Sequence, residues 1–166
     1  LVATALAFDA RLGDAGLRLP SPLVARRAAL VDVDVGPEMT TARSGGWREP
    51  GLERPFGSYL WLEGDASLVL PGVGVDLGAK TPAMLVFAAR PEKRRGSCLR
   101  VDVALNGRRI ATVIPFVGWR EYRLPIPPGV LRPGDNELAF SARRSEVPAR
   151  FGVTYARIAR SASVSE

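Results

Sequence analysis

The 166-residue chain contains no histidine and only one cysteine, Cys98. Histidine is the commonest general base and the usual transition-metal ligand, so its absence excludes every catalytic triad built on that residue. A single cysteine excludes an intrachain disulfide and a thiolate cluster that could hold zinc. The sequence therefore lacks the residues on which most hydrolase and zinc sites depend, and it favours neither an oxidising nor a reducing compartment.

Lysine is nearly absent as well, since Lys80 and Lys93 are the only two. The formal net charge of +6 therefore comes almost entirely from arginine. The densest basic run, Arg90 to Gly96, contains no aromatic residue on which a nucleic-acid base could stack. Because charge runs are usually solvated surface segments, we expect a loop here and no nucleic-acid partner.

Long apolar runs are missing too. The first stretch, "LVATALAF", is far shorter than the roughly 20 residues needed to cross a bilayer, and because it shows no charged leader we do not expect it to be a signal peptide. It is either the tail of a membrane helix or a docked N-terminal segment. The "LPSPL" break at 19–23 stops any long helix, so we expect residues 1–28 to form a short irregular or helical segment or linker.

The residues that are present favour β structure. The 17 glycines and 14 prolines lie between short apolar runs, and from Ala29 onward the apolar period is two, as in "ALVDVDVG". About nine such runs, separated by turn signals, predict an all-β fold, an antiparallel sandwich or barrel over residues 29–160, followed by a tail at 161–166. The other runs are "YLWLE", "ASLVL", "AMLVFAAR", "LRVDVAL", "RRIATVI", "REYRLPI", "NELAFSAR" and "FGVTYARI".

Two turns stand out. Asn106-Gly107 lies between alternating runs, and both residue types tolerate the positive φ that a type I′ hairpin requires. This hairpin would place Arg108 and Arg109 at the rim of the sheet, where charges cost little. Gly64-Asp65 predicts a second turn, between one strand at 59–63 and another at 66–70.

Catalysis would require groups that the pattern does not supply. Two carboxylate pairs, Glu49 with Glu53 and Glu63 with Asp65, are close in sequence, but we expect them to form surface salt bridges rather than a glycosidase pair. Neither lysine belongs to an S-x-x-K motif. The prediction is therefore a domain that is not an enzyme.

A metal site is only weakly indicated. The turn before "NELAF" contains Asp135, Asn136 and Glu137, whose oxygens could bind a structural calcium ion, although the loop has no recognisable ligand spacing. Ordinary turn chemistry explains the same residues. We therefore expect no cofactor, with structural calcium as the alternative.

The aromatic residues give the best candidates for ligand contact. Trp47 and Trp119 both follow glycine and both precede Arg-Glu, in contexts that resemble loops. Flat rings beside hydrogen-bonding side chains suit a pyranose face. The alternative is that both rings plug the ends of the sandwich. The candidate ligand-binding residues are Trp47, Arg48, Glu49, Trp119, Arg120 and Glu121.

The order of four motifs resembles that of a known family. The motifs are "GGWREPG…RPFGSYLWLEGDASLVLP", "LRVDVALNGRRI", "GWREYRLPIPPGVLRPGDNELAF" and "RFGVTYARI", and the similarity covers about Asp32 to Ile158. They resemble the galactose-binding-like jelly-roll accessory domains of bacterial membrane glycosyltransferases, which are similar to carbohydrate-binding modules. The resemblance implies that the matching positions are chiefly structural: Asn106, Gly107, Trp119, Tyr122, Leu124, Pro125, Leu131, Gly134 and Asn136.

The resemblance also implies a function and a location. It implies a non-catalytic jelly-roll module that lies outside the cytoplasm, at the bacterial cell envelope. Such a module would bind glycan or envelope polysaccharide and would be associated with glycan synthesis or transfer. The alternative is a structural or protein-interaction domain that docks onto a membrane-protein partner or oligomerises. A hydrolase with a carboxylate pair is a third and weaker interpretation.

Overall fold

The computed structural model describes residues 29–39, 41–53, 57–73, 82–92, 99–115, 117–144 and 147–160, and these form ten strands and no helix. Consequently none of them forms a helix that could span a membrane. The segments predicted at 1–28 and 161–166, together with Cys98 and the Lys93–Gly96 part of the basic run, lie outside the described residues. The strands are β1 (Ala29–Asp34), β2 (Arg43–Glu53), β3 (Gly57–Val73), β4 (Ala83–Pro91), β5 (Leu99–Leu105), β6 (Arg108–Val113), β7 (Arg120–Ile126), β8 (Gly134–Arg144), β9 (Val147–Pro148) and β10 (Arg150–Arg160).

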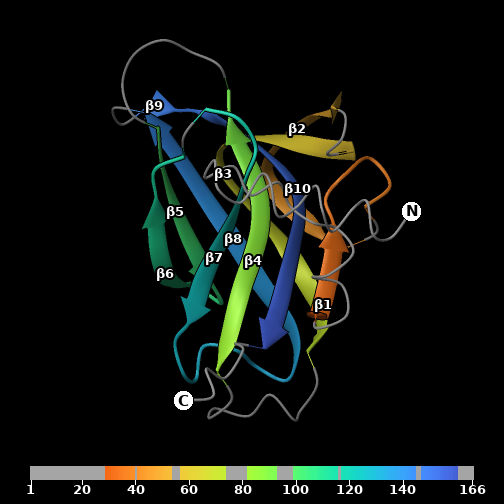
Figure 1. Ribbon diagram of the computed structural model, residues 1–166, viewed down its shortest axis with the longest axis vertical. Helices are drawn as coiled ribbons and strands as arrows, with labels where there is room; N and C mark the ends of the chain where they lie inside the picture. The colour runs from red at the N-terminus through yellow and green to blue at the C-terminus, as the bar shows by residue number, and fades with distance from the viewer. Residues whose placement is uncertain are drawn as a thin grey trace, which may run out of the picture.

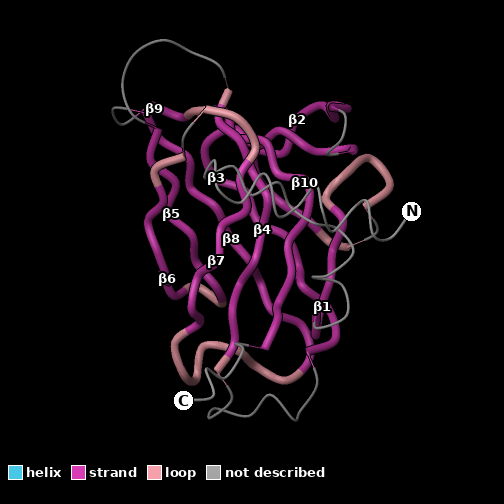
Figure 2. The backbone as a smooth tube through the Cα atoms, viewed as in Figure 1, coloured by secondary structure: helices cyan, strands magenta, loops and turns pink. Residues whose placement is uncertain are grey.

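The strands form an antiparallel sandwich, which confirms the predicted fold class (Figure 1, Figure 2). Their order is β6-β5-β8-β3-β10-β4-β7, with β2 paired to β3, β1 to β10 and the short β9 to β8. β6 and β7 also approach each other, so the sheet nearly closes. The first sheet comprises β6, β5, β8 and the second half of β3, and the second sheet comprises β7, β4, β10 and the first half of β3.

The prediction of a turn at Gly64-Asp65 is wrong, because β3 continues through both residues without a break. Residues 60–63 pair with β10, whereas residues 65–73 pair with β8. Gly64 has a φ of 71°, which lets the strand bend from one sheet into the other. The alternation of buried and exposed residues keeps its phase across this bend, so the two apolar runs belong to one strand.

The core lies between the two sheets. The alternating strands turn their apolar residues inward, as Val31 and Val33 do on β1 while Asp32 and Asp34 face outward. The Phe140 ring of β8 lies 5.4 Å from the Phe87 ring of β4, measured between centroids, so the sheets contact through aromatic side chains. The largest fully buried side chains are Phe87, Phe140, Phe151, Leu60, Leu62, Leu68, Leu70, Leu85, Leu105, Leu138, Ile158 and Val35.

The Asn106-Gly107 hairpin is confirmed, with φ values of 51° and 77°. Asn106 also connects this hairpin to the turn before β8. Its side-chain amide donates to the Val130 carbonyl at 2.8 Å and to the Asn136 side chain at 2.7 Å, and its oxygen accepts from the Glu137 amide at 3.0 Å. The hairpin is therefore fixed at one end of the sandwich by side-chain hydrogen bonds as well as by its own backbone.

Candidate functional site

Trp47 lies within β2 and not in a loop, so the predicted loop around it is wrong. Its ring packs against the core, and its indole N–H donates to the Ser67 carbonyl on β3 at 2.7 Å. The reason is a register shift between Gly45 and Trp47, a bulge that turns the ring inward. Gly45 and Gly46, which suggested a loop, instead allow the backbones of β2 and β3 to approach each other closely.

Arg48 and Glu49, also on β2, both form ion pairs. The Arg48 side chain donates to Glu63 at 3.2 Å, and Glu49 accepts from Arg150 at 2.9 Å. A backbone hydrogen bond and the Arg150 guanidinium hold the pKa of Glu49 below its usual value. A catalytic acid needs a raised pKa, and the surroundings of Glu49 have the opposite effect.

Trp119 lies just before β7 and is only 5% exposed. Its ring packs edge-on against Tyr59, with centroids 5.1 Å apart, and Tyr59 packs in the same way against Trp61 at 5.3 Å. The Arg90 guanidinium lies within 6 Å of all three ring centroids and pairs with Glu53. We refer to Arg90, Tyr59, Trp61 and Trp119 as the arginine cluster. The ring of Trp119 therefore contributes to packing among these aromatic side chains, outside the core between the two sheets.

Arg120 and Glu121 begin β7, and Glu121 belongs to a second set of polar contacts. It accepts from the Tyr155 hydroxyl at 2.6 Å and from Arg123 at 2.7 Å. Burial raises the pKa of Tyr155 above its usual value, and the hydrogen bond to Glu121 raises it further, so this hydroxyl stays protonated and donates. Arg120 is exposed.

The structure thus places the two predicted triplets in different surroundings. Trp47, Arg48 and Glu49 lie on β2 beside β3, whereas Trp119 joins the arginine cluster and Glu121 contacts β10. Their contact with a ligand stays a prediction.

Replacing Arg90 with methionine is expected to lower the free energy of unfolding by about 2 kcal/mol, because methionine keeps an apolar stem but loses the contacts with three rings and Glu53. The matched control is Arg48→Met, which removes an ion pair between more exposed side chains and is expected to cost less than about 1 kcal/mol. Urea denaturation measures both. Equal losses would contradict a special contribution from the arginine cluster.

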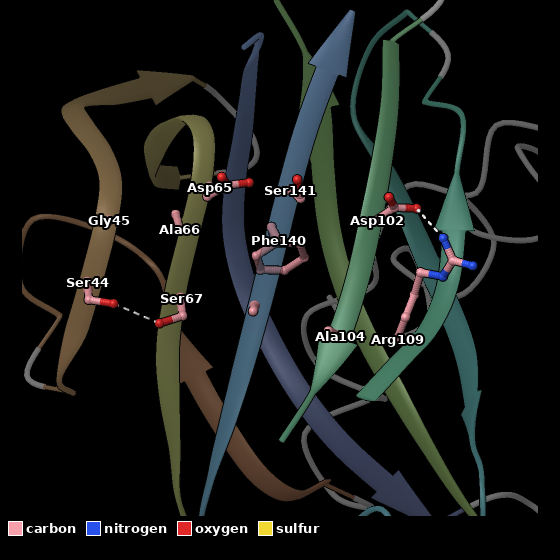
Figure 3. Close-up of a pocket in the computed structure, with 11 residues that line it drawn as sticks. Ser44, Gly45, Asp65, Ala66, Ser67, Asp102, Ala104, Arg109, Phe140 and Ser141 are labelled. Carbon is pink, nitrogen blue, oxygen red and sulfur yellow. Dashed lines mark hydrogen bonds and ion pairs between the residues drawn. The ribbon is translucent and has the colours of Figure 1, made fainter. Parts of the chain in front are cut away.

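A shallow groove of about 340 Å³ crosses the outer face of the first sheet (Figure 3). It lies on strands β2, β3, β8, β5 and β6, on the side opposite the core. Alternation along each strand turns small or polar residues to this face. The lining residues are Ser44, Gly45, Asp65, Ala66, Ser67, Asp102, Ala104, Arg109, Ala139, Phe140 and Ser141.

Strand register arranges the outward-facing residues of the groove in two rows across the strands. Since neighbouring strands lie about 4.8 Å apart, the longer row spans about 19 Å. The first row is Ser44, Ser67, Ala139, Ala104 and Arg109, each opposite the next on the neighbouring strand. The second row is Asp65, Ser141, Asp102 and Thr112, the last lying at the edge of the groove.

The groove combines a small apolar floor with oriented polar groups. Ala104 and Ala139 leave methyl groups and open space at its centre. The Ser44 and Ser67 hydroxyls lie 2.9 Å apart and are exposed, so each can both donate and accept. This combination suits a ligand that has apolar C–H faces and hydroxyl edges.

Two carboxylates flank Ser141 in the second row. Asp65 accepts from Arg143 at 2.6 Å, and Asp102 accepts from Thr112 and lies 3.8 Å from Arg109. The hydrogen bond from Ser141 and that from Arg143 lower the pKa of Asp65 below its usual value, so this carboxylate is ionised at neutral pH. Because the side chain of Asp65 is 68% exposed, its remaining oxygen lone pairs can accept hydrogen bonds from a ligand.

Sequence reasoning did not find these groove residues. The outward positions of the strand patterns hold Asp65, Ser67, Ala139, Ser141, Asp102 and Ala104, and this run of short side chains is the signal that could have indicated an open face. Arg109 lies at the rim of the sheet, as the hairpin predicts, and there it also lines the groove.

The turn suggested for calcium uses its side chains otherwise. Asn136 is completely buried, and its oxygen accepts from the Arg132 amide while its NH₂ group donates to the Arg132 and Gly134 carbonyls. Asp135 accepts from the Gly72 amide at 3.2 Å. Within the described part of the chain, no group of three or more His, Cys, Asp or Glu side chains could hold a metal ion. Structural calcium stays an untested alternative.

No model of a known protein family matches the sequence, and no curated protein does. Solved structures do share the fold. The CBM36-1 domain, a carbohydrate-binding module of a multidomain xylanase from the hindgut metagenome of Trinervitermes trinervoides, has a TM-score of 0.51 and 13% identity, over 78% of this chain and 96% of that domain. The CBM22-1 xylan-binding domain from Paenibacillus barcinonensis has a TM-score of 0.52 and 13% identity, over 80% and 94%.

An exo-β-1,3-galactanase from Phanerochaete chrysosporium also matches, with a TM-score of 0.53 and 14% identity, over 76% of this chain but only 28% of that one. At these identities the likeness establishes the fold: a jelly-roll sandwich like those of carbohydrate-binding modules.

Proposed function

We propose that this domain is a non-catalytic carbohydrate-binding domain whose groove on the first sheet holds a glycan. The observation that carries the proposal is the pair of residue rows, which places methyl groups, hydroxyls and carboxylates side by side on one open face. Sugars offer the complementary surface, because their C–H groups can cover the alanines while their hydroxyls bond to the polar residues. The fold shared with carbohydrate-binding modules supports the same function.

The carboxylates of this face support binding rather than hydrolysis. A glycosidase needs one carboxyl group with a raised pKa facing a second one across the scissile bond. Asp65 instead has a lowered pKa and an arginine partner, and the same holds for Glu49 on β2. Glu53 pairs with Arg90 in the arginine cluster.

Replacing Ala139 with tryptophan is expected to weaken glycan binding at least tenfold, because a large ring would fill the centre of the groove. Ala139 is half-exposed on the outer face, so the new side chain can extend into solvent and the fold should persist. Isothermal titration calorimetry with oligosaccharides of xylan, arabinan, galactan, mannan and glucan measures the effect, after thermal unfolding has confirmed that the variant is folded.

The matched control is Val117→Trp, which adds the same ring to an exposed position between β6 and β7. It is expected to leave affinity within about twofold of the parent. Binding that survives in Ala139→Trp would show that the groove is not the site. No heat with any glycan at millimolar concentration would end the proposal.

We further propose that the domain lies outside the cytoplasm at the bacterial cell envelope, near a membrane protein of glycan synthesis. Support for this part comes from the sequence resemblance alone. Protease accessibility in intact cells after removal of the outer envelope layers tests it, and protection of the domain there would count against it.

A further inference from the structure

We infer that the groove selects a neutral oligosaccharide, bound across the strands through its hydroxyl groups, and discriminates against glycans that carry carboxylates. The inference rests on the proposed function and adds the class of ligand. It depends on the charges that line the groove, on what each charge already contacts and on the spacing of the two aspartates.

The charges lining the groove differ from those of the whole chain. The chain carries +6, which taken alone favours an acidic ligand. The groove lining contains two acidic residues, Asp65 and Asp102, and one basic residue, Arg109. Among the residues that line the groove, the acidic side chains therefore outnumber the basic one, and this lining does not favour an anion.

Two arginines beside the groove, Arg143 and Arg109, are already paired with aspartates. Arg143 contacts Asp65 at 2.6 Å. Arg109 lies 3.8 Å from Asp102, and Figure 3 shows this pair. A ligand carboxylate that approached either arginine would also approach the aspartate beside it, and like charges at such distances repel. A sugar hydroxyl meets no such conflict, because it can donate to an aspartate oxygen while the arginine stays in place.

The aspartates also determine the length of ligand that can contact both. Asp65 and Asp102 lie opposite Ser141 on either side of β8, two strand spacings or about 10 Å apart. One sugar ring can reach both carboxylates only with hydroxyls at its opposite ends, whereas the longer row of about 19 Å offers contacts to several residues of a glycan chain. Affinity is therefore expected to increase with chain length until the row across the five strands is filled.

The test compares one glycan in neutral and charged forms. The probe is whichever galactan, mannan or glucan oligosaccharide binds in the calorimetric panel, together with the same oligosaccharide oxidised at C6 to carboxylates and the methyl ester of the oxidised form. We expect the oxidised form to bind at least tenfold more weakly and the ester to recover most of that loss. Monosaccharides are expected to give no measurable heat.

Asp65→Asn and Asp102→Asn keep the shape of each side chain but remove its charge. Each is expected to weaken binding of the neutral glycan several-fold and to reduce its preference over the oxidised form. Asp135→Asn is the matched control, since it makes the same charge change outside the groove lining and should change neither value. Thermal unfolding shows whether all three variants are folded.

The outcomes separate this inference from the proposed function. Equal or tighter binding of the oxidised glycan, still lost in Ala139→Trp, would overturn the neutral-ligand inference and leave carbohydrate binding intact. The inference would also be overturned if Asp65→Asn and Asp102→Asn both kept the full preference of the parent domain for the neutral glycan over the oxidised form. Absence of binding to every glycan would remove both proposals together.

Discussion

Replacing Asn136 with alanine is expected to lower the free energy of unfolding by about 3 kcal/mol, one of the two largest effects that we expect from a single substitution. The side chain is completely buried and makes hydrogen bonds to the Arg132 amide and carbonyl at 2.9 Å, and it accepts one from Asn106 at 2.7 Å. Alanine would leave these groups unpaired, and each buried unpaired group costs about 1–3 kcal/mol. Denaturant unfolding followed by far-UV circular dichroism measures the loss.

The adjacent Asp135 supplies the control for this substitution. It is exposed and makes one hydrogen bond of 3.2 Å, so Asp135→Ala is expected to cost less than about 1 kcal/mol. A double-mutant cycle of Asn106→Ala with Asn136→Ala should show a coupling of about 1 kcal/mol or more, since the two side chains share a hydrogen bond. Similar costs for Asn136→Ala and Asp135→Ala would contradict the structural role of Asn136.

Gly46→Ala is expected to destabilise the domain by about 3 kcal/mol, at the upper end of the cost of overpacking. A Cβ at this position would lie 2.0 Å from the Glu63 carbonyl oxygen and 3.1 Å from that of Asp65. Both atoms belong to the β3 backbone, which cannot move without breaking its pairing to β2. Because Ser44 at the groove edge and Trp47 depend on that pairing, glycan binding should weaken together with stability.

Gly107→Ala separates this steric effect from the loss of a glycine as such. Gly107 has a φ of 77°, but a Cβ there would meet no atom within 4 Å, so the cost should be the backbone strain of about 1–2 kcal/mol. Chemical denaturation gives the stability of both variants, and calorimetry gives their affinity. A greater loss for Gly107→Ala than for Gly46→Ala would show that β2 and β3 are less closely packed than the structure indicates.

Most of the fold could be predicted from the sequence because apolar alternation and turn chemistry are local signals. They were sufficient for most strands and for the Asn106-Gly107 hairpin, whose positive φ values follow from its residue types. The prediction of a turn at Gly64-Asp65 was wrong because a strand that bends from one sheet into the other uses the same residue types as a turn. Only the unbroken phase of burial on both sides of Gly64 distinguishes the two cases.

The groove could not be predicted, because it depends on strand register. Ser44, Ser67, Ala139 and Ala104 come from four strands that are far apart in the chain and meet only through cross-strand pairing. Both predicted tryptophans take part in packing, and their contact with a ligand stays a prediction. Trp47 faces the core because of a bulge, and Trp119 packs within the arginine cluster. Both outcomes depend on tertiary contacts.

The position of β10 has a consequence for folding. β10 is the last strand in the described chain, yet it pairs with β4 along one edge and along the other with β3 at residues 150–153 and with β1 at 155–159. The second sheet therefore lacks its central strand until this segment has been synthesised, whereas β3, β5, β6 and β8 of the first sheet can pair earlier. Contacts such as that between Asp32 and Arg157 join residues more than a hundred positions apart in the sequence. A fold that depends on such long-range strand pairing folds slowly. The nascent first sheet, with its apolar face uncovered, is then the species most exposed to aggregation.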